Sequence, residues 1–299
     1  GAEDHRRLLF AVGVEDRPRK HAQVVYAPDV TDSNVMVPGE SESGRTTALA
    51  TMIVSAALTY TPRRVQFVVL AFSGADLNDV QHLPHVVSFA RGSERQRVGR
   101  SIAEIKALIG QREAAFNRDG IKLTDFRAGR FGGGPELLPD DPFGDVFLVI
   151  DGWNDFKSSY EPLVADIEEI LRRGPRHGAH MIISSDGWIA SGLNARMMST
   201  FTANVELKLP KVDETNHNPN PEVLKTIPFG EQEVFDAETA DQQLGEVARV
   251  RVRVTGRGRS MLGYHFQTGR PFLTIDGERV AVNDPRAAAL IGRVAGQSR

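Results

Sequence analysis

The chain has 299 residues, of which 40% are hydrophobic and 25% are charged, so it can bury a full core in one large domain or two small ones. Its formal net charge of −3 argues against a protein that is basic overall and coats nucleic acid. It contains no cysteine, which excludes disulfides and thiolate metal sites, and it has neither a recognisable signal peptide nor an apolar run near the roughly 18 residues of a membrane span. The chain begins Gly1-Ala2 without methionine, from which we expect a cloning scar or a cut from a longer protein.

The first elements predicted along the chain are short strands. Residues 8–14 form an apolar run, a charged turn follows around Pro18, and residues 23–27 have the composition of a strand. A further β-like run at residues 35–37 is followed by a glycine-bounded loop and then by apolar residues at the i, i+3, i+4 spacing of an amphipathic helix, which Pro62 ends. Strand, glycine-bounded loop and helix in this order are the setting of a P-loop.

The segment between this strand and this helix, GESESGRTT, fits the phosphate-binding pattern GxxxxGK[ST] with one departure, because Arg45 stands where the pattern has lysine. In such a loop, backbone N–H groups and the positive end of the helix hold the phosphates of ATP, and the hydroxyl after the cation, here Thr46, holds Mg²⁺. A guanidinium is bulkier than an ammonium, and Glu40 and Glu42 add negative charge, so we expect weakened binding. The alternative is an ordinary turn with a surface arginine. The candidate nucleotide-binding residues are Gly39, Glu40, Ser41, Glu42, Ser43, Gly44, Arg45, Thr46 and Thr47.

Two further elements precede the second motif. Residues 65–72 (VQFVVLAF) form a continuous apolar run typical of a buried parallel strand, and the carboxyl ends of such strands contact ligands. Residues 91–130 carry ten Lys or Arg against five Asp or Glu, with an apolar stripe that predicts a helix with a basic face. We interpret this face as solvated and expect no nucleic-acid contact, because no aromatic side chains interleave with the charges. A surface loop is expected over residues 129–142.

The second motif is the uniformly apolar run at residues 146–150, which ends in Asp151. A carboxylate at the end of a strand parallel to the P-loop strand is the Walker B position that holds Mg²⁺, whereas the alternative is an aspartate that caps the next helix. Gly152 follows, where hydrolysing members of this broad class usually carry the glutamate that activates water, so the general base is missing. Ser184 and Ser185 end a later strand and are candidate sensors of the γ-phosphate.

The remaining elements continue the alternation of helices and strands. Because this alternation runs through residues 34–209, we predict a doubly wound, mostly parallel sheet in a single α/β domain over residues 1–299. The elements expected are helices over residues 163–171 and through Met198, a strand at 180–185, an edge strand at 205–209, a polar stretch at 213–221, a half-exposed strand at 249–254, a hairpin at 272–282 with an Asp276-Gly277 turn, and a terminal helix or linker at 285–299.

The segment after Asp186 holds more apolar residues than one helix needs to face its own sheet. We therefore predict a groove for a partner peptide there, since methionines suit a surface that repacks around different ligands. The alternative is an ordinary core helix. The groove residues predicted are Trp188, Ile189, Leu193 and Met197.

These segments together resemble the FtsK/SpoIIIE-type ATPase domains of the EccC family, the coupling ATPases of type VII (ESX) secretion. The resemblance covers most of residues 8–273, and the Asp-Gly-Trp after the Walker B strand is similar to the second and third ATPase domains of that family rather than to the first. It implies a RecA-like, additional-strand P-loop NTPase fold, with a mostly parallel sheet flanked by helices and a C-terminal antiparallel hairpin. The matching runs are VGVEDRPRK, the P-loop, LTYTPRRVQFVVLAF, LPHVVSFA, DVFLVIDGW, RRGPRHGAHMIISSDGW and TGRGRSMLGYHFQTGRP.

The resemblance also implies site residues, with Gly39, Gly44, Arg45, Thr46 and Thr47 in the Walker A loop and Asp151 as the Walker B acid. The chain departs from the family pattern at Arg45, in the Glu-rich loop, and at Asp186, where related domains often have Asn or Arg. These departures argue against hydrolysis and against strong nucleotide binding.

The function predicted from these features is a degenerate ATP–Mg²⁺-binding module of a type VII secretion motor, with weak or absent hydrolysis. The partners implied are neighbouring ATPase modules and the C-terminal signal of secreted WXG100-type substrates. The resemblance implies a cytoplasmic position within an inner-membrane-associated complex, with membrane contact only through parts outside this chain. The alternatives are a competent ATPase whose base comes from elsewhere, an FtsK-like DNA translocase domain, and a nucleotide-free scaffold.

Overall fold

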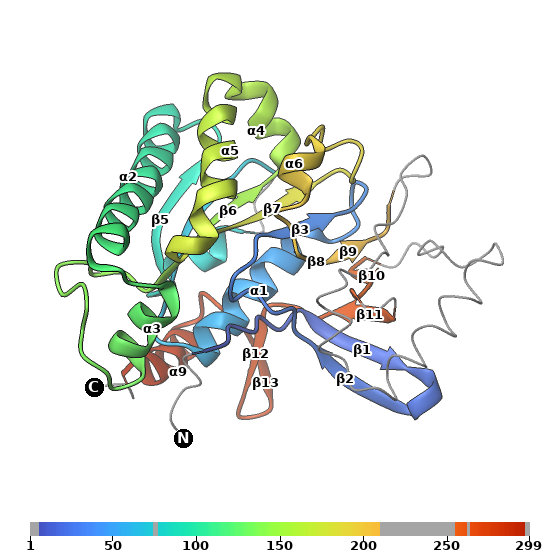
Figure 1. Cartoon of the computed structure of the whole chain (residues 1–299). Coiled ribbons are helices and arrows are strands. Elements are labelled where there is room, and N and C mark those ends of the chain that lie inside the picture. The colour runs from blue at the N-terminus through green and yellow to red at the C-terminus, as the bar shows by residue number, and fades with distance from the viewer. Residues whose placement is uncertain (1–5, 74–76, 210–254, 262–263, 297–299) are drawn as a thin grey trace.

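A six-stranded sheet of parallel strands forms the centre of the molecule in the computed structural model (Figure 1). The structure describes residues 6–73, 77–209, 255–261 and 264–296. The strand that precedes the P-loop and the strand that ends in Asp151 lie on either side of one inserted strand, which confirms the additional-strand arrangement. In spatial order the strands are β5 (Val86–Arg91), β4 (Val65–Ala71), β6 (Asp145–Asp151), β7 (Ala179–Ser185), β3 (Val35–Pro38) and β8 (Ala203–Asn204).

Helices cover both faces of this sheet, because its central strands direct apolar side chains to both sides. In β6, Phe147 and Val149 pack into one core with α1 and α9, whereas Leu148 packs into a second core with α2, α4 and α5 (Figure 1). Within the described ranges, none of the helices combines the length and the apolar character that a membrane span requires. The helices are α1 (Arg45–Thr59), α2 (Arg95–Asp119), α3 (Leu123–Phe131), α4 (Trp153–Ser159), α5 (Val164–Arg173), α6 (Ala195–Met198) and α9 (Pro285–Gly296), with 3-10 turns at Pro18–Lys20, Asn78–His82, Glu161–Leu163 and Gly174–His177.

A second sheet of five antiparallel strands joins the beginning of the chain to its end, which the sequence did not predict. Only Val205 separates β8, at the edge of the parallel sheet, from β9, at the edge of this one. The antiparallel sheet brings Gly256 onto the P-loop, where its N–H donates to Ser43 O at 2.7 Å. In spatial order its strands are β2 (Ala22–Tyr26), β1 (Gly13–Arg17), β11 (His265–Thr268), β10 (Arg257–Arg259) and β9 (Glu206–Leu207).

The C-terminal hairpin is confirmed. Strand β12 (Phe272–Ile275) pairs antiparallel with β13 (Glu278–Ala281). Asp276 and Gly277 connect them with φ angles of 52° and 83°, the left-handed geometry of a two-residue hairpin turn. Helix α9 follows within the stretch predicted to be a helix or linker.

Two local predictions are wrong. The helix expected through Met198 is reduced to α6, because Gly192 adopts a φ of 63° and Asn194 then caps α6 by accepting the N–H of Met197 at 3.0 Å. The loop expected from residue 129 begins instead at Gly132, because α3 continues to Phe131. The strand predicted at 249–254 and the polar stretch at 213–221 lie outside the described residues.

A buried ion cluster stabilises the amino end of β6. The Asp145 side chain is 1% exposed. Its carboxylate forms ion pairs with Arg127 Nη2 at 2.5 Å and with Arg64 Nη1, and it lies 3.2 Å from His180 Nε2, within hydrogen-bonding distance. Burial alone would raise the pKa of Asp145, but the charges of Arg127 and Arg64 and the hydrogen bond with His180 outweigh it and hold the pKa well below its usual range. The cluster therefore stabilises the fold wherever Asp145 is ionised.

We expect Asp145→Asn to lower the free energy of unfolding by about 3–5 kcal/mol, because it removes the buried carboxylate to which the buried guanidinium groups of Arg64 and Arg127 donate. The depressed pKa means that the stabilisation is present above the ordinary aspartate pKa near 3.9 and is lost as the pH falls below it toward the folded-state value. Urea denaturation at neutral pH measures the loss. Asp140→Asn, at an exposed position on the neighbouring loop, is the matched control and should change stability by less than about 0.5 kcal/mol. Equal effects of the two changes would contradict a structural role for the cluster.

Candidate nucleotide-binding site

The loop predicted to bind phosphates connects β3 to α1 at the carboxyl edge of the parallel sheet (Figure 1). Gly44 is the N-cap of α1 with a φ of 99°, a left-handed conformation that favours glycine. A Cβ at Gly44 would lie 2.9 Å from Gly256 N, and a Cβ at Gly39 would lie 2.4 Å from Ser43 Oγ. Both glycines of the pattern are therefore needed for the loop to fold against itself and against the antiparallel sheet.

Hydroxyl and carboxylate groups from α1, β6, β7 and the segment after β4 meet beside this loop. Thr46 Oγ1, on α1, donates to Asp151 Oδ2 at 3.0 Å, and Ser184 Oγ, on β7, donates to Asp151 Oδ1 at 2.8 Å. Ser73, just after β4, places its Oγ 3.5 Å from Thr46 Oγ1. Oxygen ligands of this kind at the N-terminus of a helix suit Mg²⁺ bound to a nucleotide, so the residues present fit the group that the P-loop implies.

Asp151 is fully buried, and its charge is only partly compensated. Burial raises the pKa of Asp151 above its ordinary value, while hydrogen bonds from Ser73, Ser184 and Thr46 and the charge of Arg45 act in the opposite direction without cancelling it. A carboxylate in this condition gains more from a bound cation than a solvated one does. The electrostatics of Asp151 thus suit a metal-binding role.

Gly152 has a conformational requirement of its own. Its φ is 92°, and a Cβ there would lie 3.1 Å from Phe72 Cβ and 3.3 Å from Ser73 Cβ. Its N–H donates to Ser184 Oγ at 2.8 Å, which in turn orients Asp151. A glutamate at this position would be strained, so the backbone that orients the Walker B acid also disfavours a side-chain base directly after it.

The charged side chains of the loop pair with residues far along the chain. Arg45 Nη1 donates to the carboxylate of Asp186, in the segment that follows β7. Glu40 is paired with Lys208 Nζ, and its N–H donates to Lys208 O at 2.7 Å. Lys208 therefore balances the negative charge of Glu40, which we expected from the sequence to oppose phosphate. Glu42, in contrast, is exposed to solvent and has a φ of 62°.

The sequence pattern of the FtsK/SpoIIIE family matches residues 2–225, a stretch that contains the whole of this edge of the sheet. The chain belongs to the FtsK/SpoIIIE family. It is 41% identical over 212 residues to the ESX-5 secretion system protein EccC5 of Mycobacterium marinum, a match that covers 70% of this chain and 15% of EccC5. It is 33% identical over 284 residues to the ESX secretion system protein EccC of Thermomonospora curvata, a match that covers 94% of this chain and 19% of that EccC.

A solved structure supports the relation to EccC. The structure of Thermomonospora curvata EccC (ATPases 2 and 3) in complex with a signal sequence peptide matches with a TM-score of 0.78 and 31% identity, over 99% of this chain and 48% of that one. The chain is thus homologous to the ATPase domains of EccC, as the sequence predicted, and it spans less than half the length of each of these relatives.

In this FtsK/SpoIIIE domain, the two candidate sensor serines occupy different positions. Ser184 is fully buried behind Asp151, so it contacts the Walker B carboxylate directly. Ser185 Oγ donates to Gly187 O at 2.9 Å and to Asn154 Oδ1 at 3.1 Å, while its carbonyl accepts the N–H of Gly39 at 3.0 Å. Asn154, which the sequence analysis did not single out, also accepts the N–H of Asp186 and so holds the segment after β7.

A cavity of about 480 Å³ lies beside the P-loop and was not predicted. Thr47 and Ala50 of α1 form one wall, and residues just before β10, at the end of β11 and just after β11 form another. Thr268 is 6% exposed, and its Oγ1 has no hydrogen-bond partner within the part of the chain that the structure describes. Only turn-forming residues, such as the Gly-Arg-Pro after β11, marked this region in the sequence. Its lining includes Thr47, Thr255, Gln267, Thr268, Pro271 and Phe272.

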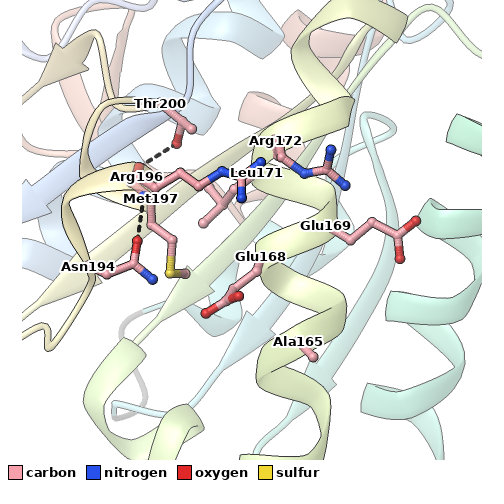
Figure 2. Close-up of a pocket in the computed structure, with 9 residues that line it drawn as sticks. All are labelled: Ala165, Glu168, Glu169, Leu171, Arg172, Asn194, Arg196, Met197 and Thr200. Carbon is pink, nitrogen blue, oxygen red and sulfur yellow. Dashed lines mark hydrogen bonds between the residues drawn. The ribbon is translucent and has the colours of Figure 1, made fainter.

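A second cavity, of about 430 Å³, lies between α5 and the segment around α6 (Figure 2). Of the four predicted groove residues, only Met197 lines it. Trp188 is buried and donates to Glu206 Oε2 at 2.9 Å, Ile189 is 65% exposed, and Leu193 is half-buried. The four residues do not share one helical face, because the chain turns at Gly192. Helix α5 supplies the opposite wall with Ala165, Glu168, Leu171 and Arg172.

We expect Asp151→Asn to raise the free energy of unfolding at neutral pH by about 1 kcal/mol, because it removes a buried charge and keeps the shape of the side chain. The pKa of Asp151 is raised in the folded state, so its ionisation costs stability as the pH rises through that value. The gain of the variant should therefore be larger at neutral pH than at about pH 4, near the ordinary aspartate pKa.

Urea denaturation at the two pH values measures this difference. Asp155→Asn, at an exposed position on α4, is the control and should show no pH-dependent gain. A variant less stable than the wild type at the higher pH would mean that the hydrogen bonds of Asp151 outweigh the burial of its charge.

Proposed function

We propose that this domain is a nucleotide-binding module of a type VII secretion motor, which binds ATP with Mg²⁺ and hydrolyses it slowly or not at all. The observation that carries the proposal is the contact of Thr46 with Asp151 beside a glycine-bounded loop, together with Gly152 in the place of a general base. The kinship with EccC supports the secretion context, while the weak hydrolysis rests on the residues of this chain alone.

Several features support binding. The N–H groups at the start of α1 and the hydroxyl of Thr46 would hold the phosphates and Mg²⁺, and the buried carboxylate of Asp151 would balance the metal charge. The cavity beside Thr47 would take the base and sugar, with Thr268 as a hydrogen-bonding group and Phe272 as an apolar surface. Mg²⁺ would supply charge neutralisation of the phosphates in this site.

Slow hydrolysis is supported by the chemistry at the end of β6. A positioned general base contributes about 10²–10⁴-fold to such reactions, and glycine has no side chain to act as one. Because Gly152 has a left-handed backbone and little room for a Cβ, the absence of a base at this position follows from the local fold. Exchanging the glycine alone for a glutamate would strain the chain. Arg45, with its planar guanidinium, also presents its charge differently from a lysine.

The basic face of α2 supports a protein-directed rather than a DNA-directed role. Lys106 pairs with Asp166 at 2.5 Å and with Glu169 at 2.9 Å, and Arg97 pairs with Glu94 at 3.0 Å. Much of the cationic charge of this helix is thus balanced within the domain, whereas DNA binding requires cations available to phosphates. We also propose a cytoplasmic position within a membrane-associated complex, and the homology to EccC supports this part of the proposal.

We expect calorimetry to show Mg²⁺-dependent binding of ATP by the 299-residue chain, with turnover on the same sample at least about a hundredfold below one per second. Asp151→Ala should abolish the Mg²⁺ dependence, while Asp155→Ala should leave it unchanged. Steady turnover near one per second that Asp151→Ala abolishes would establish a competent ATPase. No binding of ATP by the wild-type chain would leave a nucleotide-free scaffold.

The cavity between α5 and α6 is the proposed docking site for a peptide, either a substrate C-terminal signal or a segment of a neighbouring module. Leu171 and Met197 give it an apolar floor, and Glu168, Arg172 and Arg196 place both signs of charge at its rim (Figure 2). Such a site suits an amphipathic segment whose apolar side chains enter the cavity. The related EccC structure with a signal sequence peptide supports this class of ligand.

Ala165→Trp should weaken binding of a synthetic WXG100-type C-terminal peptide by about tenfold or more, because the indole would fill the cavity from the exposed face of α5. Fluorescence anisotropy with a labelled peptide measures the affinity. Ala107→Trp, at an exposed position of α2, is the matched control and should leave it unchanged. Equal affinities of the wild type and of both variants would place the peptide elsewhere.

A further inference from the structure

We propose that Asp186 sets the nucleotide affinity of this domain by holding Arg45, so that phosphate must displace a carboxylate that the chain itself supplies. The inference rests on the proposed function, because it concerns the same phosphate-binding loop. It assigns to Asp186 an inhibitory positioning role.

The contact that carries this inference joins two segments 141 residues apart. Arg45 is the first residue of α1, at the point where the loop offers its cation, and its Nη1 lies against Asp186 Oδ1. The arginine side chain is 16% exposed and the aspartate side chain is 52% exposed. The pair thus lies at the mouth of the site, with its acidic member facing solvent.

The position of Asp186 is fixed by its neighbours. Its N–H donates to Asn154 Oδ1 at 3.1 Å, and the same amide group of Asn154 donates through Nδ2 to Ala190 O at 2.7 Å. The backbone after β7 is also tied to the loop, because Ser185 O accepts the N–H of Gly39 at 3.0 Å. The carboxylate is therefore presented to Arg45 by a braced segment.

A carboxylate in this position opposes phosphate in two ways. It occupies donors of the guanidinium that would otherwise face the phosphate oxygens, since both anions favour the same planar edge. It also repels an incoming polyphosphate of like charge. An asparagine in its place would keep nearly the same shape and could still accept a hydrogen bond, but it would hold the guanidinium less strongly and would not repel phosphate. Asp186→Asn therefore isolates the charge.

The other acidic residues of the loop do not share this role. Glu40 is paired with Lys208, and Glu42 is turned to solvent by its left-handed backbone. Asp151 contacts the hydroxyls of Thr46 and Ser184 and belongs to the metal side of the site. Asp186 is thus the carboxylate to which Arg45 is bound in the structure.

We expect Asp186→Asn to tighten Mg²⁺–ATP binding by about three- to tenfold, as calorimetry would measure it, because a half-exposed ion pair contributes modestly. In an Arg45→Gln background, Asp186→Asn should change the affinity by less than about twofold, since the guanidinium to be released is gone and only the solvent-screened repulsion of phosphate remains. Asp119→Asn removes a comparable exposed pair, with Arg118, at the far end of α2 and should leave the affinity unchanged. Thermal unfolding of each variant checks that the fold persists.

The outcomes separate this inference from the proposed function. If the wild-type chain binds Mg²⁺–ATP and Asp186→Asn binds it equally or more weakly, the inhibitory role is wrong and the nucleotide-binding function stands. An equal gain in the wild-type and Arg45→Gln backgrounds would likewise overturn it, because Asp186 would then act by repulsion alone. If none of the variants binds Mg²⁺–ATP or Mg²⁺–tripolyphosphate, both proposals fail. Binding by Asp186→Asn alone would support the inference most directly.

Discussion

Strand β6 carries a buried carboxylate at each end, and the surroundings of the two determine how the domain is organised. Asp145, at the amino end, is ringed by Arg64, Arg127 and His180, so its charge is balanced within the protein and its pKa is depressed. Asp151, at the carboxyl end, accepts hydrogen bonds from the hydroxyl groups of Thr46 and Ser184, and burial raises its pKa. Breaking a buried ion pair costs several kcal/mol, whereas a partly compensated carboxylate stabilises a bound cation. One central strand therefore stabilises the fold at one edge of the sheet and, at the other edge, carries the carboxylate that we propose as a metal ligand.

The same division gives a physical reason for the separation of nucleotide binding from hydrolysis that we propose for this domain. The orientation of Asp151 depends on Ser184, which depends on the N–H of Gly152. That N–H points correctly because Gly152 has a left-handed backbone, and the space for a Cβ there is limited by Phe72 and Ser73. A base placed directly after the Walker B acid would disturb the group that positions the acid. The local geometry thus supports the proposal that Asp151 is retained as a metal ligand without a catalytic side chain beside it.

Much of this site was predictable because its signals are local. The two glycines around residues 39–44, the apolar run before Asp151, and the Asp-Gly turn of the hairpin each encode a conformation within a few residues. The five-stranded sheet was not predictable, since β1 pairs with β11 about 250 residues away and periodicity carries no information on such contacts. The segment after Asp186 was misassigned because its apolar spacing suits a helix, while Gly192 and the Asn194 cap end that helix. The ion-pair partners of Arg45 and Glu40 could not be predicted either, because each partner lies more than 140 residues away along the chain.

These long-range ion pairs determine which interactions within the protein a nucleotide would have to replace on binding to this domain. Arg45 is bound to Asp186 and Glu40 to Lys208, so the charged groups of the loop have partners in the protein before any phosphate arrives. The backbone is occupied in the same way, since the N–H groups of Gly39 and Glu40 donate to Ser185 O and Lys208 O. Binding is then an exchange of internal partners for phosphate oxygens, and its free energy is the difference between two sets of similar interactions. Such a difference is small compared with either set, which is why single charges outside the P-loop motif can decide whether the loop retains a nucleotide.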